Sequence, residues 1–224
     1  MTSSEYNRDQ LEAIRMVRDH LKDLPSKEIR GLTKMIEPYL QFRTAVADFH
    51  KRHLSGICTD KCFTDKTSAC CGREGIATFF ADVVINILSS PPEKLDIIEQ
   101  LLLDDGGGFK CVYLTHKGCL WKMKPVVCEM FLCEHAKNCL AEENDSLLNE
   151  WKSLREREKD FTWPDRRVLF DELEEFFIHE GYDSPLMYFH KSPGLLKVKK
   201  KRDIIKNIRY RVYGIRCKGN PKKP

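Results

Sequence analysis

The placement of the cysteines constrains this chain more than any other feature of its sequence. Eight of the ten cysteines lie between residues 58 and 133, whereas residues 1–57 contain none. Disulfides rarely persist in a reducing compartment, and clustered cysteines there are more often metal ligands or redox groups. We therefore predict eight metal ligands: Cys58, Cys62, Cys70, Cys71, Cys111, Cys119, Cys128 and Cys133.

The reducing compartment is itself an expectation from the sequence. The first residues carry charges of both signs and lack the apolar stretch of a secretory signal. The longest mostly apolar run, residues 75–88, is too short to span a bilayer and contains Asp82. The chain is 42% apolar and 32% charged, which is typical of globular proteins. We expect a cytoplasmic protein with no membrane segment.

Thiolates are soft ligands, which select zinc, Cu(I) or iron–sulfur clusters over magnesium or calcium. The short spacing from Cys58 to Cys62 brings two sulfurs close at a small cost in entropy, and the adjacent pair Cys70-Cys71 does not readily form a disulfide. Eight sulfurs exceed one four-ligand site. Three arrangements are therefore possible: two metal sites, one cluster together with one zinc ion, or one site with spare redox thiols. The alternative is that free cysteines are small buried apolar residues, which we favour only for Cys139 and Cys217.

The cysteines and their neighbours stand in a distinctive order. That order is Cys58-x3-Cys62-x7-Cys70-Cys71, Cys111-Val-Tyr-Leu, Gly118-Cys119-Leu-Trp and Lys124-Pro125-Val-Val-Cys128-x4-Cys133. It resembles the YkgJ-type cysteine-cluster family, which is described as a zinc- or iron-chelating domain, over residues 56–135. Flagellin lysine N-methylases carry a similar cluster linked to iron–sulfur chemistry. The resemblance implies zinc or an iron–sulfur cluster as cofactor, and as an alternative function an iron–sulfur-dependent enzyme of methyl transfer or redox chemistry.

The chain departs from that family at three places. The first cysteines are spaced more widely than the usual two-residue gaps, Trp121 stands where tyrosine is usual, and Lys124 replaces an arginine. If that arginine clamps an anion or a carboxylate, Lys124 keeps the charge but loses the bidentate fork.

The fold class that we predict is mainly α, with an irregular cysteine-rich loop and a small β-hairpin around a metal site. Residues 4–54 repeat apolar side chains every three or four positions, as helices do, with Pro38 breaking or kinking the second helix. Residues 75–88 read as a buried helix, and Pro91-Pro92 starts another. We divide the chain into four segments, namely a helical segment 1–55, the metal-binding region 56–140, a helical segment 141–196 and a basic tail 197–224.

The hairpin is expected over residues 109–123, with a three-residue loop at 116–118. An odd loop length places one set of side chains on a shared face, namely Cys111, Tyr113, Cys119, Trp121 and Met123. A loop of two or four residues would put the two cysteines on opposite faces. After Pro125 we expect a short helix over 126–140, in which Cys128 and Cys133 point the same way only if the helix loosens or ends between them.

The basic tail is the second feature with a bearing on function. Residues 197–224 hold 12 lysines and arginines and one aspartate, a net charge of +11 in a chain whose total is +4. Aromatic residues alternate with arginines at 209–213, a mixture that can track a phosphate backbone and stack on bases. Two interpretations of the tail are equally good: it binds RNA or another anionic partner, or it is a solvated segment. Residues 171–175 are interpreted as the solvent-exposed side of an amphipathic helix. His53, His116 and His135 could be metal ligands, but we favour solvated or hydrogen-bonded side chains for all three.

Overall fold

The protein is mainly α-helical over the residues that the computed structural model describes, which are 3–57, 77–104, 111–115, 118–163 and 165–188. The helices are α1 (Ser3–Asp23), α2 (Ser26–His53), α3 (Ser55–Ile57), α4 (Phe80–Ser89), α5 (Pro92–Leu103), α6 (Val126–Glu129), α7 (Glu134–Glu143), α8 (Asp145–Thr162) and α9 (Leu169–His179). A 3-10 turn, η3 (Pro185–Tyr188), and two strands, β1 (Leu114–Thr115) and β2 (Gly118–Cys119), complete these elements. The predicted class is confirmed as mainly α, and the four-segment division of the chain stays a prediction.

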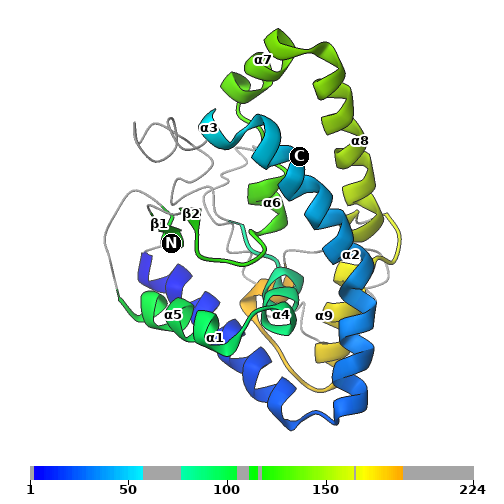
Figure 1. Ribbon diagram of the computed structural model, residues 1–224. Helices are drawn as coiled ribbons and strands as arrows, with labels where there is room; N and C mark the ends of the chain where they lie inside the picture. Colours follow the sequence, from blue (N-terminus) through cyan, green and yellow to red (C-terminus); the bar gives the residue numbers. More distant parts are fainter. Residues whose placement is uncertain (1–2, 58–76, 105–110, 116–117, 164, 189–224) are drawn as a thin grey trace, which may run out of the picture.

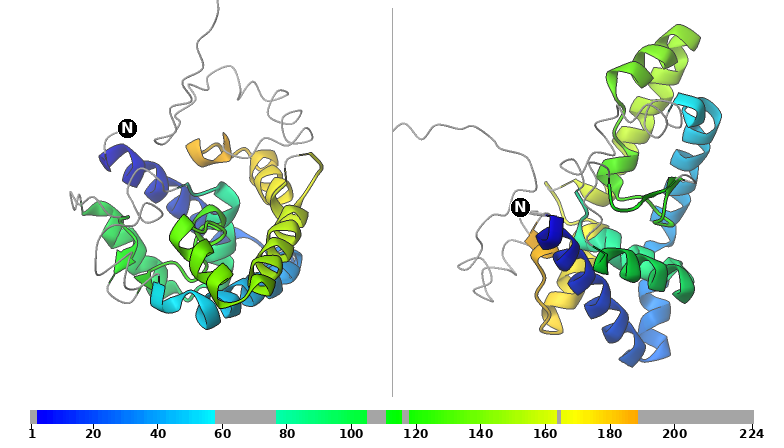
Figure 2. Two further views of the ribbon diagram at one scale, coloured as in Figure 1. Left: turned by 90° about the horizontal axis from the view of Figure 1, so that it is seen from above. Right: turned by 90° about the vertical axis from the view of Figure 1, so that its left-hand side faces the viewer.

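One hydrophobic core joins helices from both ends of the chain. The helix α1 packs on α4 and α5, α4 packs on α9, and α2 packs on α4, α8 and α9. Phe80 of α4 meets Phe177 of α9 edge to face, with ring centroids 5.1 Å apart, and both side chains are fully buried. Figure 1 and the right view of Figure 2 show α7 and α8 extending away from α1 and α5. The segment with Cys111–Cys133 also packs on this core, through Tyr113 and Trp121.

The helix α4 confirms the buried helix that the sequence predicts. Every residue from Phe80 to Asn86 is buried, including the charged Asp82. A carboxylate in such a helix needs partners, because an isolated buried charge is strongly unfavourable. None of the helices in the described ranges combines the length and the apolar composition needed to cross a bilayer.

The helix α2 continues through Pro38, so the predicted break there is wrong. Pro38 is exposed, whereas Ile36 and Tyr39 on either side of it are fully buried. The buried stripe of α2 consists of Leu32, Ile36, Tyr39, Phe42, Arg43, Val46 and Phe49. Packing of this stripe on both sides of the proline offsets the hydrogen bond that the proline cannot donate.

The hairpin has a shorter loop than the sequence predicts. The strand pairs are Leu114 with Cys119 and Thr115 with Gly118. Two residues, 116–117, therefore connect the strands, and the predicted three-residue loop is wrong. In a regular hairpin of this register, Cys111 and Cys119 would lie on opposite faces, so the shared face derived from strand alternation is wrong as well.

A turn, not strand alternation, sets the direction of the chain before β1. The N–H of Leu114 donates to the carbonyl of Cys111 at 3.0 Å, which closes a four-residue turn. The N–H of Leu120 donates to the carbonyl of Tyr113 at 2.8 Å. The rings of Tyr113 and Trp121 then meet edge to face, with centroids 5.1 Å apart. The two aromatic residues thus lie together, for a reason other than the predicted one.

The helix expected over residues 126–140 is divided into α6 and α7. Pro125 precedes α6, and the helical hydrogen bonds end with Met130 N–H donating to Val126 at 2.9 Å. The chain turns before Cys133, which stands at the N-cap of α7. The helix therefore ends between Cys128 and Cys133, one of the two conditions for both cysteines to face the same way.

Residues 171–175 differ from the prediction of a solvated face. Asp171 and Glu174 are each 1% exposed. Asp171 Oδ2 accepts the N–H of Val168 at 3.0 Å, a bond that fixes the start of α9. The carboxylate is therefore part of the helix terminus and of the core.

Candidate metal centre and its supporting network

Half of the predicted ligands belong to the part of the chain that the structure describes. Cys111 lies in the turn before β1, Cys119 in β2, Cys128 in α6 and Cys133 at the start of α7, and all four are partly buried. The other four, Cys58, Cys62, Cys70 and Cys71, lie outside the described residues, as do His116, Cys217 and the basic tail 197–224.

The thiols of Cys111 and Cys119 lie close enough to interact electrostatically. Burial raises the pKa of Cys111 to about 12, while backbone N–H groups of Tyr113 and Leu114 act in the opposite direction. Burial also raises the pKa of Cys119, against the opposing effect of the Lys124 ammonium. Both thiols are thus neutral at pH 7 in the absence of a bound cation, and a metal ion would displace their protons.

Tyr6 of α1 connects the turn before β1 with α6. Its buried hydroxyl lies 3.4 Å from Oγ1 of Thr78. Burial raises the pKa of Tyr6, and Cys111 and Cys128 raise it further through their charge. Tyr6 is thus linked electrostatically with Cys111 and Cys128, and Cys111 in turn with Cys119. Thr78, which follows the Cys58–Cys71 stretch by a few residues, meets the same hydroxyl.

Cys133 has a separate structural role. Its sulfur accepts the N–H of Ala136 at 3.4 Å and so caps the first turn of α7. This capping contact does not exclude a metal, since thiolate ligands also accept N–H hydrogen bonds.

Within the described ranges, no group of three or more Cys, His, Asp or Glu side chains is arranged to hold a metal ion. Two of the three histidines considered as ligands, His53 and His135, lie in the described ranges and have other neighbours. His53 Nδ1 lies 3.6 Å from Glu143, and His135 Nε2 lies 3.8 Å from the sulfur of Cys139. The described cysteines thus do not form a complete metal site by themselves.

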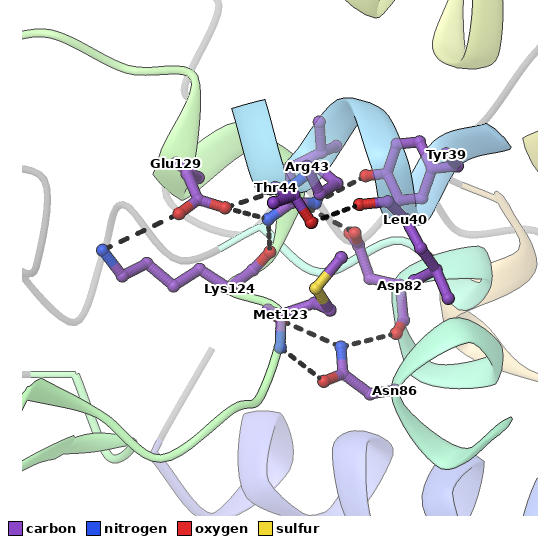
Figure 3. A network of polar contacts seen from close by, with 10 residues as sticks. Tyr39, Leu40, Arg43, Thr44, Asp82, Asn86, Met123, Lys124 and Glu129 are labelled. Atoms are coloured by element: carbon purple, nitrogen blue, oxygen red, sulfur yellow. Dashed lines mark hydrogen bonds and ion pairs between the residues drawn. The ribbon is translucent and has the colours of Figure 1, made fainter. Parts of the chain in front are cut away.

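A buried ion pair supports the segment that carries Cys128 (Figure 3). Arg43 of α2 is 1% exposed, and its Nε donates to Oε2 of Glu129 at 3.0 Å while its Nη2 contacts the same carboxylate. Nη1 of Arg43 donates to the hydroxyl of Tyr39 at 2.6 Å, and Nη2 donates to the carbonyl of Lys124 at 2.5 Å. One guanidinium therefore fixes both ends of the stretch from Lys124 to Glu129.

Two side chains of α4 fix the same stretch from the other side. Asp82 accepts the N–H of Val126 through Oδ1 at 3.1 Å and the N–H of Phe79 through Oδ2 at 3.1 Å. Asn86 pairs with the backbone of Met123, donating to its carbonyl at 2.8 Å and accepting its N–H at 2.9 Å. Figure 3 shows both side chains facing this backbone. The segment after β2 is thus hydrogen-bonded at three successive points.

Lys124 makes only a long ion pair with the buried carboxylate of Glu129. Nζ of Lys124 lies 4.0 Å from Oε1 of Glu129, and its side chain is 43% exposed. Arg43, from a distant part of the sequence, supplies the guanidinium that binds Glu129. The Lys124 ammonium instead interacts with the thiol of Cys119.

Sequence reasoning missed this network, although two signals were present. Arg43 follows Phe42 on the apolar stripe of α2, and Asp82 lies inside the apolar run 75–88. A charge at a position that periodicity assigns to the core indicates a buried partner. The partners, Glu129 and the N–H of Val126, lie more than 40 residues away in sequence and cannot be identified from local pattern.

Comparison of the chain with protein-family models, with curated proteins and with solved structures found no match. The resemblance to the YkgJ-type family, the enzyme alternative and the RNA or anionic partner of residues 197–224 stay predictions.

Proposed function

We propose that the protein binds zinc or an iron–sulfur cluster through cysteine thiolates. The ligands are drawn from the eight clustered cysteines, with Cys111, Cys119 and Cys128 supplying one side of the site. The observation that carries this proposal is the electrostatic linkage of three cysteines from a turn, a strand and a helix, in which Cys111 interacts with Cys119 and Tyr6 interacts with both Cys111 and Cys128. Thr78 at the same hydroxyl supports a supply of further sulfurs from Cys58–Cys71.

A cation at this place must displace the protons of buried thiols. Buried thiols with a raised pKa are poor nucleophiles, because the neutral form dominates at pH 7. A divalent metal or a cluster iron changes this balance, since thiolate ligands lose their protons on binding. Structural zinc sites contribute roughly 10–16 kcal/mol of apparent binding free energy, comparable with a domain stability of about 5–15 kcal/mol. The metal thus has enough binding energy to order the residues that surround it.

Single serine substitutions test the ligand set. We expect Cys111→Ser, Cys119→Ser and Cys128→Ser each to lose most of the bound metal, measured per chain by elemental analysis after anaerobic purification. Cys139→Ser is the matched control, because Cys139 is also partly buried but contacts His135 of its own helix. Metal content equal to that of the wild type in all four variants would contradict the proposal.

The same samples distinguish the two metals. A brown protein with iron and acid-labile sulfide identifies an iron–sulfur cluster, whereas a colourless protein with zinc identifies structural coordination. A wild-type protein that contains neither zinc nor an iron–sulfur cluster would rule out the proposed function.

A further inference from the structure

The helix that carries Cys128 is too short to be stable by itself. It has four residues, and isolated helices shorter than about 12–15 residues are marginal in water. Its position must therefore come from side chains of other elements. Three long helices supply them, namely α2 through Arg43, α4 through Asp82, and α8 through Arg155, whose Nη1 donates to the carbonyl of Met130 at 2.9 Å.

These contacts reach the backbone of α6 at both of its ends. Asp82 satisfies the N–H of the first helical residue, Val126. Arg155 donates to the carbonyl of Met130, the residue directly after the last helical residue, Glu129. Arg43 joins the two ends through Lys124 and Glu129. The α6 backbone, and with it the Cβ of Cys128, is held in one place relative to the core.

We propose that Arg43, Asp82 and Arg155 are positioning residues for the metal, which act by holding α6 so that the Cys128 sulfur points at the site. This inference rests on the proposed function and deepens it, because it assigns residues that do not touch the metal. Groups that orient metal ligands typically change metal affinity about 10- to 100-fold when they are removed. Here the orienting contacts are made to the backbone that carries the ligand.

A buried ion pair suits this role better than a stabilising role. Replacing such a pair with apolar side chains of similar size is often neutral for stability, whereas removing one partner alone leaves an unpaired buried charge. The Arg43–Glu129 pair instead fixes the orientation of the α6 backbone, because the planar guanidinium donates to Tyr39, Lys124 and Glu129 at the same time. The double substitution Arg43→Met with Glu129→Met therefore removes these orienting hydrogen bonds. It keeps a similar side-chain volume and leaves no unpaired buried charge.

The test compares two double variants of the full chain. Arg43→Met/Glu129→Met removes the buried pair, and Arg52→Met/Glu150→Met removes an exposed pair that also joins two helices, at 3.0 Å. Cobalt(II) serves as the probe, because its sulfur charge-transfer band reports thiolate ligands and chelator competition gives its affinity. Arg155→Met is a third variant, and its half-exposed side chain makes its loss tolerable for folding.

We expect Arg43→Met/Glu129→Met to bind cobalt about 10- to 100-fold more weakly than the wild type, with an altered charge-transfer band. Arg155→Met should shift both readouts in the same direction, and Arg52→Met/Glu150→Met should match the wild type. Wild-type affinity and band shape in both Arg43→Met/Glu129→Met and Arg155→Met would overturn the positioning role while the proposed function stands. A wild-type protein without the thiolate band would overturn the proposed function first and the positioning role with it.

Discussion

At the scale of single residues, the buried charges of this protein stand out from its apolar surroundings. Asp82 is 2% exposed, and it accepts two backbone N–H groups that start α4 and α6. Burial raises the pKa of Asp82 to about 7, although Arg43 and both N–H donors act in the opposite direction. The N–H bonds explain why an acid is placed here, and burial explains why it binds its proton so firmly.

This pKa predicts how stability depends on pH. In the unfolded chain the Asp82 carboxyl loses its proton near pH 4, whereas in the folded protein it keeps the proton up to about pH 7. Between these values the unfolded state binds fewer protons, so the contribution of Asp82 to stability falls as the pH rises. The loss from pH 4.5 to pH 7.5 should be on the order of a few kcal/mol, measured by urea unfolding.

The variant Asp82→Asn isolates this contribution, because asparagine has nearly the same shape but does not titrate. The difference in unfolding free energy between wild type and Asp82→Asn should decrease steadily over that pH range. Asp48→Asn, at an exposed position of α2, is the control and should follow the wild-type curve. A pH-independent difference for Asp82→Asn would show that Asp82 ionises normally in the folded protein.

At the scale of elements, α2 shows where local sequence rules are overridden. The sequence predicts a break or a kink at Pro38, and the helix runs without a break from Ser26 to His53. The apolar stripe passes Pro38 without a change of period, with Ile36 before it and Tyr39 after it. That continuity was visible in the sequence, and it describes the structure better than the proline does.

Removing the proline should therefore stabilise the protein. Pro38 is exposed, so Pro38→Ala restores a backbone N–H donor in the helix interior without disturbing the core. We expect the free energy of unfolding to rise by about 1–3 kcal/mol, measured by urea denaturation. Glu37→Ala, at the neighbouring exposed position, should change it by less than about 0.5 kcal/mol. No gain for Pro38→Ala would mean that the local backbone is adapted to proline.

The short elements were harder to predict than the long ones. The hairpin loop is one residue shorter than expected, and a turn from Cys111 to Leu114 stands where regular strand was expected. The expected helix over 126–140 is two helices, since the backbone at Val126 and Met130 is bonded to Asp82 and Arg155. Such long-range contacts outweigh local propensity in segments of two to four residues.

At the scale of the whole molecule, the sequence predicts most of the core helices. For the candidate metal site it predicts which residue type would bind, but not how those residues are arranged. Amphipathic periodicity identified the helices that form the core, and cysteine clustering identified the candidate ligands. Periodicity carries no information on which distant partner neutralises Arg43 or Asp82, because those partners come from other elements. Cys111, Cys119 and Cys133 pack on the same core as the helices.

X-ray absorption at the metal edge, on the full chain purified without oxygen, tests the central claim most directly. We expect metal in stoichiometric amount with a first shell of sulfur at about 2.3 Å. A chain that carries no metal, or one whose metal has only nitrogen and oxygen neighbours at about 2.0–2.2 Å, would contradict it.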